Sequence, residues 1–299
     1  MITRAVVALA AITIFFGFSL FANAQKKSPK TLNPTANDQR EAFSDIDLDT
    51  YVIGNTILML YHELAHALIA DSGLPSLGGE ENAADDFALV ELIVQIHAAD
   101  QDLEEQKRLK SYGFAFIDFW LKSSVERGAP VSDDYFGEHA LDLQRHFNAA
   151  CLLYGGSAEI FHEIAEVFSI ETEILQRCKL LYFSAYDGWS YTLGQFGLLA
   201  DEASGVENIL IFEFSTPERE QHQRWWSLAQ ESDALAMLAE QFSRTFDISA
   251  PIKVRFEACE EENAYFDPTS GNVIMCYEFM NAFSRYYGQD TSKAVMQRP

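Results

Sequence analysis

The sequence predicts an α+β fold that is predominantly α-helical, with a small hairpin or sheet near the C-terminus. Between residues 50 and 192, stretches rich in Leu, Ile, Ala and Phe are separated by short segments that contain Gly and Pro, as expected for helices in series. At Ile252–Phe256 the pattern changes to strict alternation of apolar and charged residues, which is typical of a strand. The strong turn sequence Asp267–Gly271 then leads into the apolar run Asn272–Cys276, which predicts a hairpin.

The N-terminus has the pattern of a secretory signal peptide. Arg4 precedes an apolar run from Ala5 to Leu20, and Ala22-Asn23-Ala24 has the form of a cleavage site. We therefore expect residues 1–24 to be removed on export and the protein to be secreted or periplasmic. An uncleaved anchor is the alternative, because the apolar run is close to the minimum length of a membrane span.

The rest of the chain divides by composition. Residues 25–40 are polar and predict a flexible lead-in, residues 41–290 predict one domain, and residues 291–299 a short tail. The sequence has 21 Lys and Arg against 45 Asp and Glu, a net charge of −24. Such an acidic chain repels phosphate backbones, which argues against nucleic acid as a partner. After cleavage of the signal, we expect no stable membrane insertion.

Four cysteines lie beyond the signal peptide, and an even number in an exported chain indicates two disulfides. Three pairings are open, and proximity in the sequence favours Cys151 with Cys178 and Cys259 with Cys276.

Further helices and a strand are predicted from the periodicity of apolar residues and from the breaks in that pattern. The helix from Thr50 ends near Asp71–Pro75, where Gly and Pro occur, and the next begins at Glu80 or Glu81 with acidic residues in its first turn. The predicted helices are Thr50–Ala70, Glu80 or Glu81 to Ala99, Gln101–Ser123, Leu141–Tyr154, Ala158–Phe168, Glu173–Thr192, Pro217–Thr245 and Glu278–Tyr287. Asn208–Phe214 predicts an additional strand.

The motif His62-Glu63-Leu64-Ala65-His66 lies within the first of these helices. Residues i and i+4 share a helix face, so both imidazoles can bind one metal ion. Glu63 can then take a proton from a water molecule at the metal, as a general base. The pattern predicts a Zn²⁺ site with His62 and His66 as ligands.

A third ligand is expected from the next helix, which begins Glu81-Asn82-Ala83-Ala84-Asp85. Glu81 is the leading candidate, because a carboxylate oxygen suits zinc. Asp85 would accept the free ring N–H of His62 or His66 and so fix that ring. Glu80 or Asp85 as the ligand remains an alternative, and Asp86 is expected to face solvent.

A hydrolytic zinc site also needs a group that stabilises a developing oxyanion. His139, Arg145 and Tyr265 are the candidates by residue type. The sequence alone favours a structural role for each over a catalytic one.

These motifs resemble a family of bacterial proteins described as a "putative metallopeptidase" family (domain-of-unknown-function family 4344). The resemblance rests on Tyr61–Leu68 and Gly79–Ala88, with further likeness at Glu138–Asn148, Cys151–Gly155 and Cys259–Glu278. It implies a zinc peptidase with a zincin-like core. It does not identify a substrate.

Two broader resemblances bear on the site. The E-x-x-A-D arrangement is similar to that of gluzincin peptidases such as the CAAX-processing type, which implies that Glu81 is a zinc ligand. Asn263-Ala264-Tyr265-Phe266-Asp267-Pro268 is similar to the N-A-Y-Y-x-P edge strand of neprilysin-like peptidases, which binds substrate backbone. There the strand precedes the H-E-x-x-H helix, whereas here it follows, so the likeness implies a permuted core with Asn263 and Ala264 as substrate contacts. The alternative is an ordinary hairpin.

The sequence therefore predicts a secreted zinc metallopeptidase that acts on peptide or protein substrates. Two alternatives remain open: a zinc hydrolase of a non-peptide amide, such as a cell-wall component, and a non-catalytic binding protein on the same scaffold. An intact Glu63 argues against the second of these.

Overall fold

The fold is built around one helix that is buried on every side. The computed structural model describes residues 46–75, 78–168, 170–200, 209–248 and 250–289. Helix α2 (Leu48–Ser72) begins at Asp47, whose side chain accepts the Thr50 N–H at 2.9 Å. It ends at Gly73, where φ is +59°. Every residue from Tyr51 to Ala65 is buried, so apolar residues cover the whole circumference of α2 rather than one stripe.

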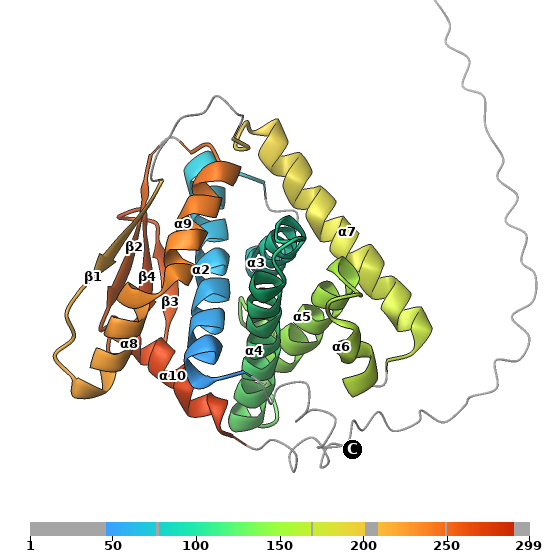
Figure 1. Cartoon of the computed structure of the whole chain (residues 1–299), viewed down its shortest axis with the longest axis horizontal. Coiled ribbons are helices and arrows are strands. Elements are labelled where there is room, and N and C mark those ends of the chain that lie inside the picture. Colours follow the sequence, from blue (N-terminus) through green and yellow to red (C-terminus); the bar gives the residue numbers. More distant parts are fainter. Residues whose placement is uncertain (1–45, 76–77, 169, 201–208, 249, 290–299) are drawn as a thin grey trace, which may run out of the picture. The chain divides into compact units, whose positions relative to one another are not determined.

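Helix α2 is long and apolar enough to cross a membrane, but 89% of its most apolar window is buried inside the protein. Its apolar surface therefore forms part of the protein core. Helices α3 and α4 cover one side of α2, and β3, β4 and α10 cover the other, as Figure 1 shows. Helix α5 packs in turn against α3 and α4, and α7 against α5.

The helices follow one another in the order that the sequence predicts. Their bounds are α3 (Glu80–Ala98), α4 (Leu103–Arg127), the 3₁₀ turn η1 (Ser132–Phe136), α5 (Asp142–Gly156), α6 (His162–Val167), α7 (Thr172–Gln195), α8 (Glu220–Glu231), α9 (Asp233–Thr245) and α10 (Tyr277–Tyr287).

A four-stranded mixed sheet covers the other side of α2. It consists of β1 (Leu210–Phe214), β2 (Ile252–Glu257), β3 (Ala264–Asp267) and β4 (Asn272–Cys276), in the order β1-β2-β4-β3. The first three in this order are parallel, whereas β3 pairs antiparallel with β4. The helix-dominated α+β class is therefore confirmed, and β3 lies at an edge of the sheet.

Three predicted helices differ from the structure in detail. The stretch predicted as one helix at residues 217–245 is two helices, because Ser232 interrupts it and caps α9 by accepting the Ala234 N–H at 3.3 Å. The helix predicted at residues 158–168 is shorter, since α6 begins only at His162. Helix α4 continues beyond Ser123 to Arg127 and ends at Gly128. The predicted signal peptide, lead-in and tail lie outside the described residues.

The structure pairs Cys151 with Cys178 and Cys259 with Cys276, the pairing that sequence proximity favours. The first disulfide joins α5 to α7 where the two backbones approach closely. At Gly155, an added Cβ would lie 2.2 Å from the carbonyl oxygen of Cys178. Only a residue without a side chain fits there, and the packing of α7 on α5 depends on it.

This contact predicts that Gly155→Ala lowers the free energy of unfolding by roughly 1–3 kcal/mol or more, because the backbones must move apart. Chemical denaturation with the disulfide intact measures the effect. Gly188→Ala is the matched control on α7, since its added Cβ would meet no atom of the described residues within 4 Å. That variant should be up to ~1 kcal/mol more stable from helix propensity. Equal stability of the two variants would contradict the close approach.

Candidate metal centre

Helices α2 and α3 bring three candidate ligand atoms to one point. His62 Nε2 lies 3.2 Å from His66 Nε2 and 3.2 Å from Glu81 Oε2, and His66 Nε2 lies 3.5 Å from the same Glu81 oxygen. The two histidines are one turn apart on α2, and Glu81 is in the first turn of α3. The sequence predicted this combination, and the structure brings all three residues together.

The other ring nitrogen of each histidine contacts a carboxylate. His62 Nδ1 lies 2.8 Å from Asp85 Oδ1, and His66 Nδ1 lies 2.8 Å from Glu80 Oε1. A carboxylate can only accept, so each Nδ1 carries the proton and donates it. In the neutral rings, both Nε2 atoms then present lone pairs toward each other and toward Glu81.

Converging lone pairs need a positive charge between them. A tetrahedral metal ion with bonds of about 2.0–2.1 Å separates its ligand atoms by about 3.3 Å. The three measured separations, 3.2, 3.2 and 3.5 Å, fit that geometry. His62, His66 and Glu81 are therefore a donor set that suits a metal ion.

The pKa values show the same attraction for positive charge. Burial opposes protonation of His62, but its contacts with Asp85 and Glu81 raise its pKa to about 9. Burial also works against ionisation of Glu81, yet its interactions with His139, His62 and His66, when these rings are protonated, hold the pKa of this carboxyl well below its usual range. The surroundings thus favour a carboxylate at Glu81 and a cation beside it.

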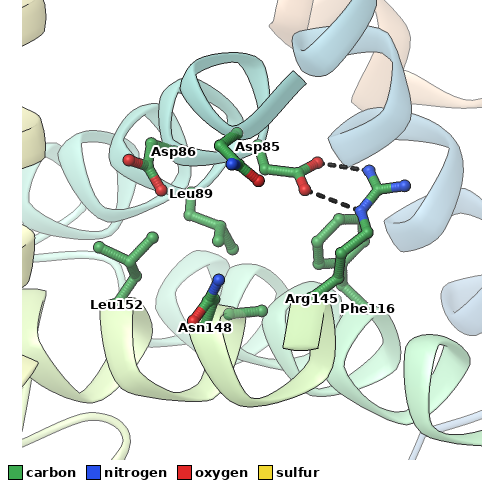
Figure 2. Close-up of a pocket in the computed structure, with 9 residues that line it drawn as sticks. Asp85, Asp86, Leu89, Phe116, Arg145, Asn148 and Leu152 are labelled. Carbon is green, nitrogen blue, oxygen red and sulfur yellow. Dashed lines mark hydrogen bonds and ion pairs between the residues drawn. The ribbon is translucent and has the colours of Figure 1, made fainter. Parts of the chain in front are cut away.

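Arg145 does not reach the ligand atoms, although the sequence offered it as an oxyanion contact. Its guanidinium binds both oxygens of Asp85, with Nε donating to Oδ2 at 2.7 Å, as Figure 2 shows. It also stacks on Trp120 at 3.6 Å from the ring centroid. Burial disfavours the charge on Asp85, but Arg145 and His62 lower its pKa to about 2. Arg145 thus keeps Asp85 ionised and in place to hold the His62 ring.

Asp86 was expected to face solvent, and this expectation is wrong. Asp86 lines a small cavity of about 20 Å³ between α3 and α5, together with Asn148 and Leu152 (Figure 2). Burial and the neighbouring charge of Asp85 raise the pKa of Asp86 to about 7. The expectation failed because α5 packs over this turn of α3, a contact that no local sequence pattern reveals.

Glu63 lies beside the ligands and is held by the edge of the sheet. Its side chain is buried, and Oε2 accepts the backbone N–H of Phe266 at 2.9 Å. Burial raises the pKa of Glu63, although the nearby His62 and His66 lower it in part. A carboxylate with a raised pKa is well suited to accept and return a proton near neutral pH.

The backbone of β3 is oriented by its pairing with β4. Asn263 C=O accepts from Cys276 N–H, so the Asn263 carbonyl is used within the sheet. Backbone groups alternate in direction along an antiparallel edge strand. Phe266 N–H points outward to Glu63, and Ala264, two residues earlier, presents its N–H and C=O to the same free edge.

Tyr265 points away from the ligands. The side chains of Ala264 and Phe266 pack against the core, so Tyr265 between them lies on the opposite face of the sheet. There burial and the charge of Glu257 raise its pKa. The sequence could not show this, because it does not reveal which face of the strand is covered.

His139 is the one oxyanion candidate that the structure brings to the site. It lies between η1 and α5, and its Nε2 is 2.8 Å from Glu81 Oε2. Its ring stacks on that of His62, with 6.3 Å between centroids and 17° between planes. His62, Glu81 and His139 form a group whose ligand atoms all lie within 4.8 Å of one another.

Two contacts at the site were not anticipated from sequence. The bond from Phe266 N–H to Glu63 is a backbone interaction over 203 residues, which side-chain patterns cannot signal. The contact of Glu80 with the Nδ1 of His66 is the other, and only the place of Glu80 beside Glu81 drew attention to it.

Together, the histidine pair, the adjacent glutamate and the carboxylate from the next helix resemble the arrangement of H-E-x-x-H metallohydrolases. A family model described as "Putative metallopeptidase" matches residues 22–193 and 214–298. The chain belongs to this family, domain-of-unknown-function family 4344. No curated protein matches the chain. No solved structure matches it either.

The bond from Asp85 to His62 predicts that Asp85→Asn weakens metal binding by roughly 10–100-fold, as is usual when a partner of a ligating histidine is changed. Competition between the protein and a chelator for Co²⁺ measures the affinity. Asp86→Asn is the matched control, because Asp86 faces the cavity beside α5. A similar loss of affinity in both variants would indicate a general effect of charge instead.

Proposed function

We propose that this protein is a secreted or periplasmic zinc-dependent metallopeptidase. The observation that carries the proposal is the convergence of His62, His66 and Glu81 at tetrahedral spacing, with Glu63 beside them. Two nitrogens and one carboxylate oxygen are a donor set that zinc prefers in hydrolases. When bound, zinc would polarise a carbonyl group and lower the pKa of a water molecule.

In this proposal the residues of the chain divide the remaining work. Glu63 takes a proton from the attacking water and delivers it to the leaving amine. Asp85, held by Arg145, keeps the His62 ring in the tautomer that directs Nε2 to the ion, and Glu80 does the same for His66. Phe266 N–H holds one oxygen of Glu63, which leaves the other for proton transfer.

The free edge of β3 favours a peptide over a non-peptide amide. An extended peptide can pair with the outward N–H and C=O of Ala264, as substrates add to exposed sheet edges. Phe266, on the same edge, contacts Glu63, so a chain bound there would lie next to the proposed base. Asn263 can contribute only through its exposed side chain, since its carbonyl bonds to β4.

Secretion is supported by the pattern of residues 1–24 and by the two disulfides, which form in oxidising compartments. The acidic chain makes nucleic acid a poor partner, and cleavage after Ala24 would leave no membrane anchor at the N-terminus. A cell-wall amide remains the second candidate substrate, to be tested beside peptides.

The ligand set predicts about one zinc per chain in the purified mature protein, and its loss in His66→Ala and Glu81→Ala. Mass spectrometry of the metal content is the measurement. Zinc that persists in Glu81→Ala would point to another third ligand. A wild-type protein that neither contains nor takes up zinc would support a binding protein without catalysis.

The role of Glu63 predicts that Glu63→Gln keeps its zinc but loses roughly 10²–10⁴-fold in kcat for peptide hydrolysis, because it cannot accept a proton. Turnover is measured on casein, a peptide library and peptidoglycan, so that peptide and cell-wall substrates are compared directly. Undiminished turnover by Glu63→Gln would remove it as the base.

The edge-strand contact predicts that Asn263→Ala raises KM for peptides with little change in kcat. Thr269→Ala, in the hairpin turn beyond β3, is the control. Unchanged kinetics for Asn263→Ala would remove this side chain from the substrate contacts.

A further inference from the structure

His139 differs from the other candidate ligands in where it comes from. His62, His66 and Glu81 lie on two packed helices, whereas His139 follows η1 in a segment that has neither helix nor strand. Residues 129–139 are all exposed, and the His139 side chain is itself 55% exposed. Little burial holds this side chain at the site, so polar contacts must account for its position.

The ring nitrogen of His139 lies among the same ligand atoms as the two helix histidines. Glu81 Oε2 has three ring nitrogens around it, at 2.8 Å from His139, 3.2 Å from His62 and 3.5 Å from His66. Because His62 and His66 carry their protons on Nδ1, their Nε2 lone pairs face this oxygen without a hydrogen bond, and a cation between these atoms would relieve the repulsion. The ligand atoms of His62, Glu81 and His139 lie within 4.8 Å of one another, so His139 can add a further ligand to such a cation.

We propose that His139 is a fourth protein ligand of the metal in the resting protein. This inference rests on the proposed zinc site. Hydrolytic zinc sites keep their fourth position for water or substrate, whereas sites with four protein ligands are closed. His139 would therefore close the resting site, and peptide hydrolysis would require it to withdraw.

The position of His139 suits such a movement. It is carried by an exposed segment between α4 and α5, and its displacement would disturb no buried apolar contact of its own. The rings of His62 and His66, in contrast, are fixed by Asp85 and Glu80. Two histidines are thus held by carboxylates, whereas His139 is exchangeable. This role differs from stabilisation of an oxyanion, in which His139 would never bind the metal.

The test is the number of imidazoles bound to zinc, measured by X-ray absorption at the zinc edge of the loaded mature protein without substrate. We expect three imidazoles in the wild type and two in His139→Ala. The zinc dissociation constant of His139→Ala, measured by chelator competition, should rise on the order of 10-fold or more. His162→Ala is the matched control, because His162 is also an exposed histidine and contacts Glu159 and Glu163 instead.

The outcomes separate this inference from the proposed function. Zinc with two imidazoles in the wild type, unchanged in His139→Ala, would overturn the fourth ligand and leave the peptidase proposal intact. A drop in kcat in His139→Ala with unchanged coordination and affinity would return His139 to the oxyanion role. A wild-type protein that binds no zinc would overturn both proposals. Because His139 is exposed, its replacement should not alter the melting temperature of the metal-free protein, which checks the fold.

Discussion

The structure depends on the burial of α2. A helix that is apolar on every side must be covered on every side, and no single layer can do this. Helices α3 and α4 cover one side and the sheet covers the other. This constraint also shapes the site, because His62 and Glu63 are polar groups within the buried part of α2 and must find partners there. The helical layer supplies Asp85 for His62, and the sheet supplies the Phe266 N–H for Glu63.

The parts of the fold that sequence reasoning predicted are those set by nearby residues. The helix pair α2 and α3 was predictable because Gly73 and Pro75 mark the end of one and Glu80 the start of the other. The hairpin of β3 and β4 was predictable from its turn residues. The parallel pairing of β1, β2 and β4 was not, since helices α8 and α9 separate β1 from β2 and strand β3 separates β2 from β4. The break at Ser232 was missed because the sequence on both sides of it has helical character.

The same distinction between local and long-range contacts explains which parts of the site were predictable. The spacing of His62, Glu63 and His66 on one helix is local information, and the structure brings those side chains to one place. Arg145 was noticed for its charge and offered as an oxyanion contact. Its partner Asp85 is 60 residues away, and through that contact Arg145 supports the group that holds the His62 ring. Tyr265 depends on register: a shift of one residue would bring it to the other face of β3. Neither the contact of Arg145 nor the orientation of Tyr265 can be predicted without knowing which elements of the fold pack together.

The second disulfide has a consequence for where the protein can work. Cys259 lies in the loop that leads into β3, and Cys276 is the last residue of β4, so their bond ties both ends of this part of the sheet together. Glu278 reinforces the loop by accepting the N–H groups of Cys259 and Glu260. The strand that holds Glu63 is thus fastened by a bond that a reducing compartment would open. A chain still in a reducing cytoplasm would lack this fastening, and the site would reach its final geometry only after oxidation. Folding of the site and exposure to an oxidising environment are thereby coupled, which would restrain the proposed hydrolysis until the chain reaches such an environment.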